Sequence, residues 1–191
     1  MKRFVLSVIY ISLILILNGC AVAAIGAVGA AAGTTAVVAT DPRSSGTVFD
    51  DNSIETKLRL KYSSYPNSNI YINSYNGIIL LTGQVANIQL KKNAVFEAKV
   101  VPGVKNIYDY LDIRLPQSFA AKSTDSLTTT QVKTKLLTAT GVDSNSIKVV
   151  TTNNVVYLMG MVTQAQAKMA ADQAASVNGV SKVITLFEYI N

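Results

Sequence analysis

The chain has 191 residues, of which 49% are hydrophobic and 15% charged, with one cysteine, no histidine and no tryptophan. This length accommodates one medium domain or two small ones with packed cores. The absence of histidine excludes Ser-His-Asp and Cys-His triads and every histidine-ligated metal site. A single cysteine excludes an intrachain disulfide and a cysteine-ligated iron–sulfur cluster. We therefore expect a protein without a metal or other cofactor.

The positive charge of the chain begins at its first residues. The net charge is +6, and Lys2 and Arg3 directly precede an apolar run at residues 4–17. This pattern is typical of a secretory signal peptide and is short for a membrane-spanning helix, which needs ~20 residues. We predict a signal peptide over residues 1–19. Its removal leaves 15 basic and 11 acidic residues, a mild excess that favours an anionic surface and not nucleic acid.

The lone cysteine follows the apolar run. Leu17-Asn18-Gly19-Cys20 resembles a bacterial lipobox, which implies that Cys20 is acylated, with palmitate among its chains, and becomes the first mature residue. Ala21 follows in place of aspartate, and by resemblance to bacterial sorting signals this implies transfer to the outer membrane, facing the periplasm. Each buried methylene contributes roughly 0.8 kcal/mol, so two or more chains give stable attachment.

A segment rich in alanine and glycine comes next. Residues 21–40 carry no charge, and Gly29 and Gly33 have the small-xxx-small spacing of packed membrane helices. An inserted helix therefore stays open, although a flexible or surface-lying tether suits these small side chains better. Residues 41–46 are turn formers. We predict a lipidated tether over residues 20–46.

The most informative feature is an internal repeat. Thr56-Lys57-Leu58 recurs 78 residues later at 134–136, and after single-residue shifts residues 72–85 align on 149–162. Shifts of one residue are typical of loop changes between duplicated domains. We predict tandem domains at 47–116 and 124–191, joined by a linker at 117–123.

Both copies show the same order of elements. Each begins with a helix, at about 53–62 and 126–139, followed by a strand that alternates apolar and polar residues. The dipeptides Asn76-Gly77 and Asn153-Asn154 predict tight hairpins, because both turn positions need positive φ. The returning strands, 78–81 and 155–158, are apolar enough to be buried on both faces.

A second helix and a last strand complete each copy. Thr163 with Gln166 predicts a capping box at the start of this helix in copy two. Apolar residues recur at helical spacing, namely Leu90, Ala94, Ala98 and Val101 in copy one and Ala167, Ala171, Ala174 and Val177 in copy two. The last strands run to Leu115 and Ile190. The order α-β-β-α-β predicts an α+β fold in which a three-stranded mixed sheet carries its helices on one face.

This order, with Gly83 and Gly160 placed after the second strand of each copy, resembles the bacterial BON domain over residues 47–115 and 124–191. We interpret both glycines as structural, required by close backbone approach or positive φ. Together with the lipobox, the two copies resemble the dual-BON outer-membrane lipoproteins of enterobacteria.

That resemblance implies a function in outer-membrane integrity and binding of anionic phospholipid, phosphatidylglycerol or cardiolipin, by the first helix of the second copy. Its candidate contact residues are Leu127, Thr130, Lys133, Thr134 and Lys135, although relatives carry an aromatic residue at the Leu127 position. A protein–protein adaptor for an envelope assembly or quality-control machine and a passive structural lipoprotein are the alternatives.

A helical wheel refines this expectation. Val132, Leu136 and Ala139 form one core-facing stripe, with Leu127 on the opposite side. We expect Asp125 to cap the helix and an extra turn to project Leu127 beyond the domain.

The acidic residues do not predict catalysis. Asp50 and Asp51 are expected to precede a helix and cap it. Asp109 and Asp112 are an odd number of residues apart in a predicted strand, so they face opposite sides of the sheet. Neither pair makes a convergent acid/base site, and we do not expect an enzyme.

Overall fold

The computed structural model describes residues 41–116 and 118–191; the predicted signal peptide, Cys20 and most of the predicted tether lie outside these ranges. The first module comprises α2 (Ser45–Tyr62), β1 (Asn69–Tyr75), β2 (Ile78–Val85), α3 (Ile88–Lys99) and β3 (Asn106–Ile113). The second comprises α4 (Phe119–Thr138), a 3-10 turn at Ser144–Ser146, β4 (Ile147–Thr152), β5 (Val155–Val162), α5 (Gln164–Ala175) and β6 (Lys182–Tyr189).

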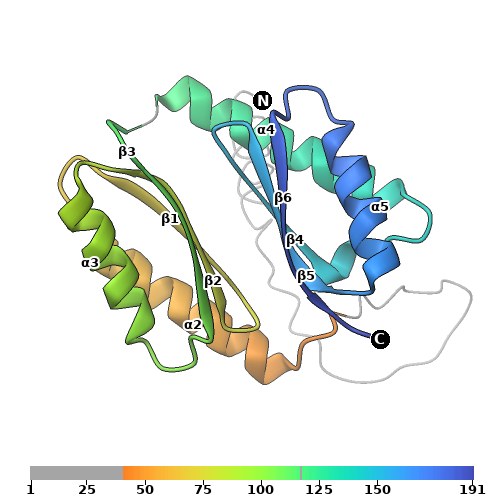
Figure 1. Ribbon diagram of the computed structural model, residues 1–191, viewed down its shortest axis with the longest axis horizontal. Helices are drawn as coiled ribbons and strands as arrows, with labels where there is room; N and C mark the ends of the chain where they lie inside the picture. Colours follow the sequence, from red (N-terminus) through yellow and green to blue (C-terminus); the bar gives the residue numbers. More distant parts are fainter. Residues whose placement is uncertain (1–40, 117) are drawn as a thin grey trace, which may run out of the picture. The chain divides into compact units, whose positions relative to one another are not determined.

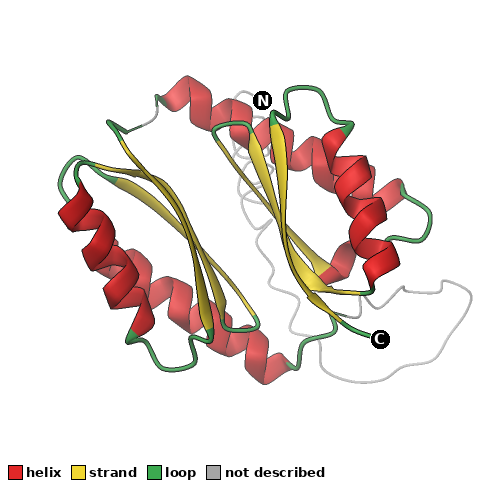
Figure 2. Ribbon diagram, viewed as in Figure 1, coloured by secondary structure: helices red, strands yellow, loops and turns green. Residues whose placement is uncertain are grey.

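Each module has a three-stranded mixed sheet. The middle strand, β2 or β5, is antiparallel to the strand before it and parallel to the last strand. The two helices of each module lie on one face of its sheet (Figures 1 and 2). The predicted α+β fold and element order are confirmed.

Small and branched side chains fill the space between helices and sheets. In the first module Leu58 of α2 and Ala94 and Ala98 of α3 are fully buried against the sheet. The second module buries Val132 and Leu136 of the expected stripe, together with three alanines of α5, namely Ala167, Ala170 and Ala174. The third expected member, Ala139, is the C-cap after α4 and is only half-buried. The prediction of Ala171 was wrong by one residue, because α5 presents positions i, i+3 and i+7 to the sheet.

The two hairpins have the predicted geometry. Asn76 and Gly77 have φ values of 52° and 77°, and Asn153 and Asn154 have 53° and 61°. Positive φ at both central positions matches the twist of the flanking strands. These turns place Tyr75 and Thr152 at the strand ends, where they meet the other module.

The first helix of each module begins earlier than predicted. Its N-cap is a serine, Ser44 or Ser118, whose hydroxyl accepts a backbone N–H in the first turn. Asp50, Asp51 and Asp125 therefore lie inside the helices, and the prediction that they cap them was wrong. Serine caps as well as aspartate does, so composition alone does not choose between them.

The buried aspartates reveal the true register of the repeat. Asp51 accepts hydrogen bonds from the N–H groups of Asn76 and Gly77, and Asp125 accepts them from Asn153 and Asn154. Equivalent first-helix positions are thus 74 residues apart, one helical turn short of the 78-residue sequence match. Both helices begin six residues before this aspartate, so the expected extra turn beyond Leu127 is absent.

The faces of the sheets opposite the helices also carry apolar residues. Buried side chains from both modules form one cluster, Tyr75, Leu80, Tyr157, Met159 and Leu186. A buried hydrogen bond of 2.9 Å joins the hydroxyls of Thr82 and Thr152. This contact explains why β2 and β5 are buried on both faces, as their sequences predict.

Candidate functional site

The exposed side of α4 carries an apolar stripe. Leu127 and Leu137 are 65% and 69% exposed, and Thr130 and Thr134 lie between them, also exposed. At 100° per residue the four positions span about 80° of the helix. Sequence reasoning missed Leu137, although its spacing of ten residues from Leu127 places both on one face.

The threonine hydroxyls of this stripe are bonded within the helix. Thr130, Thr134 and Thr138 each donate to the carbonyl oxygen four residues earlier, at 3.1, 3.0 and 3.2 Å. A threonine bonded in this way has its hydroxyl donor satisfied. Its contact with an apolar phase therefore costs less than that of a free hydroxyl.

Lysines flank the stripe. Lys133 and Lys135 are exposed on its two sides, and neither forms an ion pair or hydrogen bond with the residues that the structure describes, 41–116 and 118–191. The acidic residue of α4, Asp125, is buried against the Asn153-Asn154 hairpin. The solvent side of α4 is therefore basic. It brings together all five predicted contact residues.

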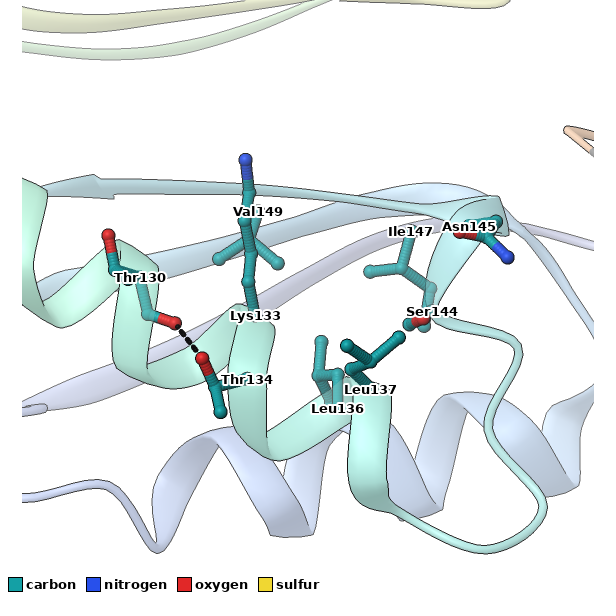
Figure 3. A pocket seen from close by; sticks show the side chains of 9 residues that line it. All are labelled: Thr130, Lys133, Thr134, Leu136, Leu137, Ser144, Asn145, Ile147 and Val149. Carbon is teal, nitrogen blue, oxygen red and sulfur yellow. Dashed lines mark hydrogen bonds between the residues drawn. The ribbon is translucent and has the colours of Figure 1, made fainter. Parts of the chain in front are cut away.

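A shallow pocket of about 400 Å³ adjoins this face, between α4 and the β4 edge. Figure 3 shows the Thr130–Thr134 hydrogen bond on its helix side and Ile147 and Val149 on its strand side. Lys133 also lines the pocket. The pocket extends the mixed apolar and basic surface of α4 toward the sheet.

The two glycines lie inside β2 and β5, not after them, and touch the neighbouring strand. A Cβ on Gly83 would lie 2.0 Å from the carbonyl oxygen of Asn69, and one on Gly160 would lie 2.2 Å from that of Ser146. Gly83 also has a φ of 108°. Close approach thus requires glycine at both positions, and positive φ adds to the requirement at Gly83.

A second cluster, centred on Arg43, was missed by sequence reasoning. The largely buried Arg43 guanidinium pairs with Asp41 and with Asp51, each at 2.7 Å, and lies 3.9 Å from the ring centre of Tyr75. The sequence Asp41-Pro42-Arg43 predicted only a turn at the end of the tether. Asp41 is a neighbour in the sequence, but Asp51 lies in α2 and Tyr75 at the end of β1, so the local sequence gave no sign of these two partners.

The carboxylate of Asp51 is the centre of this cluster. Burial alone raises its pKa, but hydrogen bonds outweigh burial and hold the pKa below its usual value; they come from Ser74, Gly77, Asn76 and Arg43. Four donors to one buried carboxylate indicate a structural role.

Asp109 and Asp112 are separate, as predicted. Asp109 pairs with Lys91 at 3.4 Å and Asp112 with Arg114 at 3.2 Å. The carboxylates of Asp109 and Asp112 therefore do not face a common site at which a substrate could react.

In the part of the chain that the structure describes, none of the helices is long and apolar enough to cross a membrane.

Comparison with known proteins defines the class. The model of the BON domain family matches residues 50–114 and 124–191. The chain therefore belongs to the BON family. It is 43% identical over 179 residues to the outer membrane lipoprotein DolP of Haemophilus influenzae, covering 92% of this chain and 91% of that protein.

Two further relatives share much of the chain. The 21 kDa hemolysin of Actinobacillus pleuropneumoniae is 35% identical, over 78% of this chain and 79% of its own. The osmotically-inducible protein Y of Escherichia coli is 33% identical, over 72% of each chain. The near full-length similarity to DolP confirms the predicted class: the chain is an outer-membrane lipoprotein with two BON domains.

Proposed function

We propose that the protein, anchored through Cys20 and facing the periplasm, binds the anionic phospholipids phosphatidylglycerol and cardiolipin through α4, and thereby supports outer-membrane integrity. The observation that supports this proposal most directly is the exposed stripe from Leu127 to Leu137, which is flanked by unpaired lysines. Exposed leucines beside lysines are the side chains that helices at a membrane interface present to anionic lipid. The function is binding, without catalysis.

The energies assign different roles to α4 and to the anchor. A lysine near an anionic surface contributes ~1 kcal/mol, and partial burial of a leucine contributes about 1–2 kcal/mol. Acyl chains on Cys20 contribute far more, at roughly 0.8 kcal/mol per methylene. The anchor therefore holds the protein, while α4 orients it and selects anionic lipid.

A protein–protein adaptor is the second candidate, and one observation favours it. Phe96 of α3 and Val100 at its C-cap are exposed. The positions 76 residues later in the second module, Asp172 and Ser176, are polar. Exposed aromatic residues are frequent hot spots of protein interfaces.

Vesicle sedimentation tests the lipid proposal. The fragment 41–191, which retains Arg43, is expected to bind phosphatidylglycerol-containing vesicles and not phosphatidylcholine vesicles. Leu127→Glu with Lys133→Glu is expected to weaken binding more than tenfold, since about 3 kcal/mol of contacts are lost. The melting temperature stays nearly unchanged, because both side chains are exposed.

The matched control is Ala165→Glu with Lys168→Glu on α5, which changes the net charge equally at exposed positions. Binding close to that of the parent fragment is expected for this control. Equal binding by the two double variants would contradict the assignment to α4, and no vesicle binding by the parent fragment would favour the adaptor function.

Cys20→Ala tests the anchor. The variant is expected to lose palmitate labelling and signal-peptide cleavage, because the thiol that carries the lipid is gone. Metabolic labelling with palmitate checks this result against the parent protein. Labelling of the variant at the parent level would show that the anchor lies elsewhere.

A further inference from the structure

The corrected register of the repeat relates α2 to α4 residue by residue. With Asp51 matched to Asp125, a spacing of 74 residues pairs Arg59 with Lys133 and Lys61 with Lys135. The same spacing pairs Thr56 with Thr130. The 78-residue sequence match conceals this correspondence, because it shifts the helix by one turn.

The solvent side of α2 has the same chemistry as that of α4. Phe49 and Leu60 are 73% and 70% exposed, and Thr56 between them donates to the carbonyl oxygen of Asn52 at 2.9 Å. At 100° per residue these three side chains fall within about 40° of each other. They form an apolar stripe about 16 Å long, at 1.5 Å per residue.

Basic residues flank this stripe as well. Lys57, Arg59 and Lys61 are all exposed. The carboxylate of Glu55 accepts hydrogen bonds from the ammonium group of Lys148 and from the backbone N–H of Ser74. The guanidinium group of Arg59 lies 3.7 Å from the same carboxylate. Asp50 is the exposed acid of α2, and it lies about 100° from Phe49 on the wheel. The net charge of the exposed face of α2 is therefore positive, and it complements an anionic surface.

The chain that leads back to Cys20 joins the described structure at the N-terminus of α2. Arg43 fixes residues 41–43 to Asp51 and Tyr75, directly before α2 begins at Ser45. Phe49 lies in the second turn of that helix. Twenty residues, 21–40, separate Cys20 from Asp41, and at ~3.4 Å each they set the greatest distance between the anchor and the residues that Arg43 fixes beside α2.

We propose that α2 is a second membrane-contact helix, which places Phe49 and Leu60 in the interface of an anionic phospholipid bilayer while Lys57, Arg59 and Lys61 meet its headgroups. This contact adds to that of α4 and does not depend on it. The two modules then each use their first helix on lipid, with an aromatic residue in the first module and leucines in the second.

A single tryptophan is a specific reporter, because the natural chain has none. Full-length lipidated Phe49→Trp protein is reconstituted into phosphatidylglycerol–phosphatidylethanolamine vesicles with brominated acyl chains. Leu127→Trp reports on α4 in the same way, and Ala165→Trp on α5 is the exposed control. Leu60→Trp is a second reporter on α2, used if circular dichroism shows that Phe49→Trp is misfolded.

The expected result is blue-shifted, strongly quenched emission from Phe49→Trp, with little quenching of Ala165→Trp. Adding Arg59→Glu and Lys61→Glu is expected to abolish the quenching, since each basic residue contributes roughly fivefold in affinity. The charge changes leave the quenching of Leu127→Trp in place.

Other outcomes overturn the proposal. If Leu127→Trp is quenched and the α2 reporters are not, α2 does not contact the membrane, and the function proposed for α4 is unaffected. If the α2 reporters are quenched and Leu127→Trp is not, α4 alone does not contact the membrane. A blue shift without bromine quenching would show that α2 is covered by protein. Equal quenching in phosphatidylcholine vesicles would contradict the role of the basic residues.

Discussion

Gly83→Val is expected to destabilise the protein most among single substitutions in the sheets. Its Cβ would lie 2.0 Å from a backbone oxygen of β1, so the β1–β2 pairing must open. The φ of 108° adds strain of about 1–3 kcal/mol for any side chain, and valine is stiff at χ1. We expect a total loss of about 4 kcal/mol or more, measured as thermal unfolding of fragment 41–191.

Two variants separate the causes. Gly160→Val meets a similar oxygen at 2.2 Å without a positive φ, so it is expected to lose less than Gly83→Val. Gly46→Ala is the control, because its nearest neighbour is a side-chain oxygen 3.7 Å away. A Gly83→Val protein that melts with the parent would disprove the close-approach explanation.

Asp51→Ala is expected to cost about 3–5 kcal/mol, because it removes one partner of a buried ion pair. Arg43 would lose a buried partner, and the hydroxyl of Ser74 and two hairpin amides would lose their acceptor. Denaturant unfolding measures the loss. Asp50→Ala is the matched control on the exposed neighbour, with an expected change within about 0.5 kcal/mol. Comparable losses for the two variants would contradict the role of Asp51.

The same carboxylate makes stability depend on pH. Its folded pKa is depressed, so its contribution is fully present above the unfolded pKa of about 3.9 and is lost as the pH falls through the folded pKa. Asp51→Asn removes this part of the acid dependence. Acid unfolding curves of the parent and the variant should therefore converge at low pH, and parallel curves would contradict this linkage.

Local patterns predicted much of the fold. The hairpins at Asn76 and Asn153, the capping box at Thr163 and the apolar returning strands depend on neighbouring residues, and the structure confirms each. The side of α4 that carries Leu127 and Lys133 followed from helical periodicity alone.

The misses depend on contacts between distant residues. The register of the first helices is set by Asp51 and Asp125 reaching the hairpins, 25 and 28 residues away. A sequence match of Thr-Lys-Leu carries no information about those bonds. The contacts of Arg43 with Asp51 and Tyr75 and the contact of Tyr75 with Ser146 likewise join residues that are not neighbours in the sequence.

Amide resonances of isotopically labelled fragment 41–191 test the central claim most directly. Titration with phosphatidylglycerol micelles is expected to shift and broaden the amides around Leu127, Thr130, Lys133, Thr134 and Leu137, with phosphatidylcholine micelles as the control. The amides of α5 should stay unchanged, since its exposed lysine is paired with Asp172. Perturbations that spare α4, or that are equal with both lipids, would contradict an anionic-lipid site on this helix.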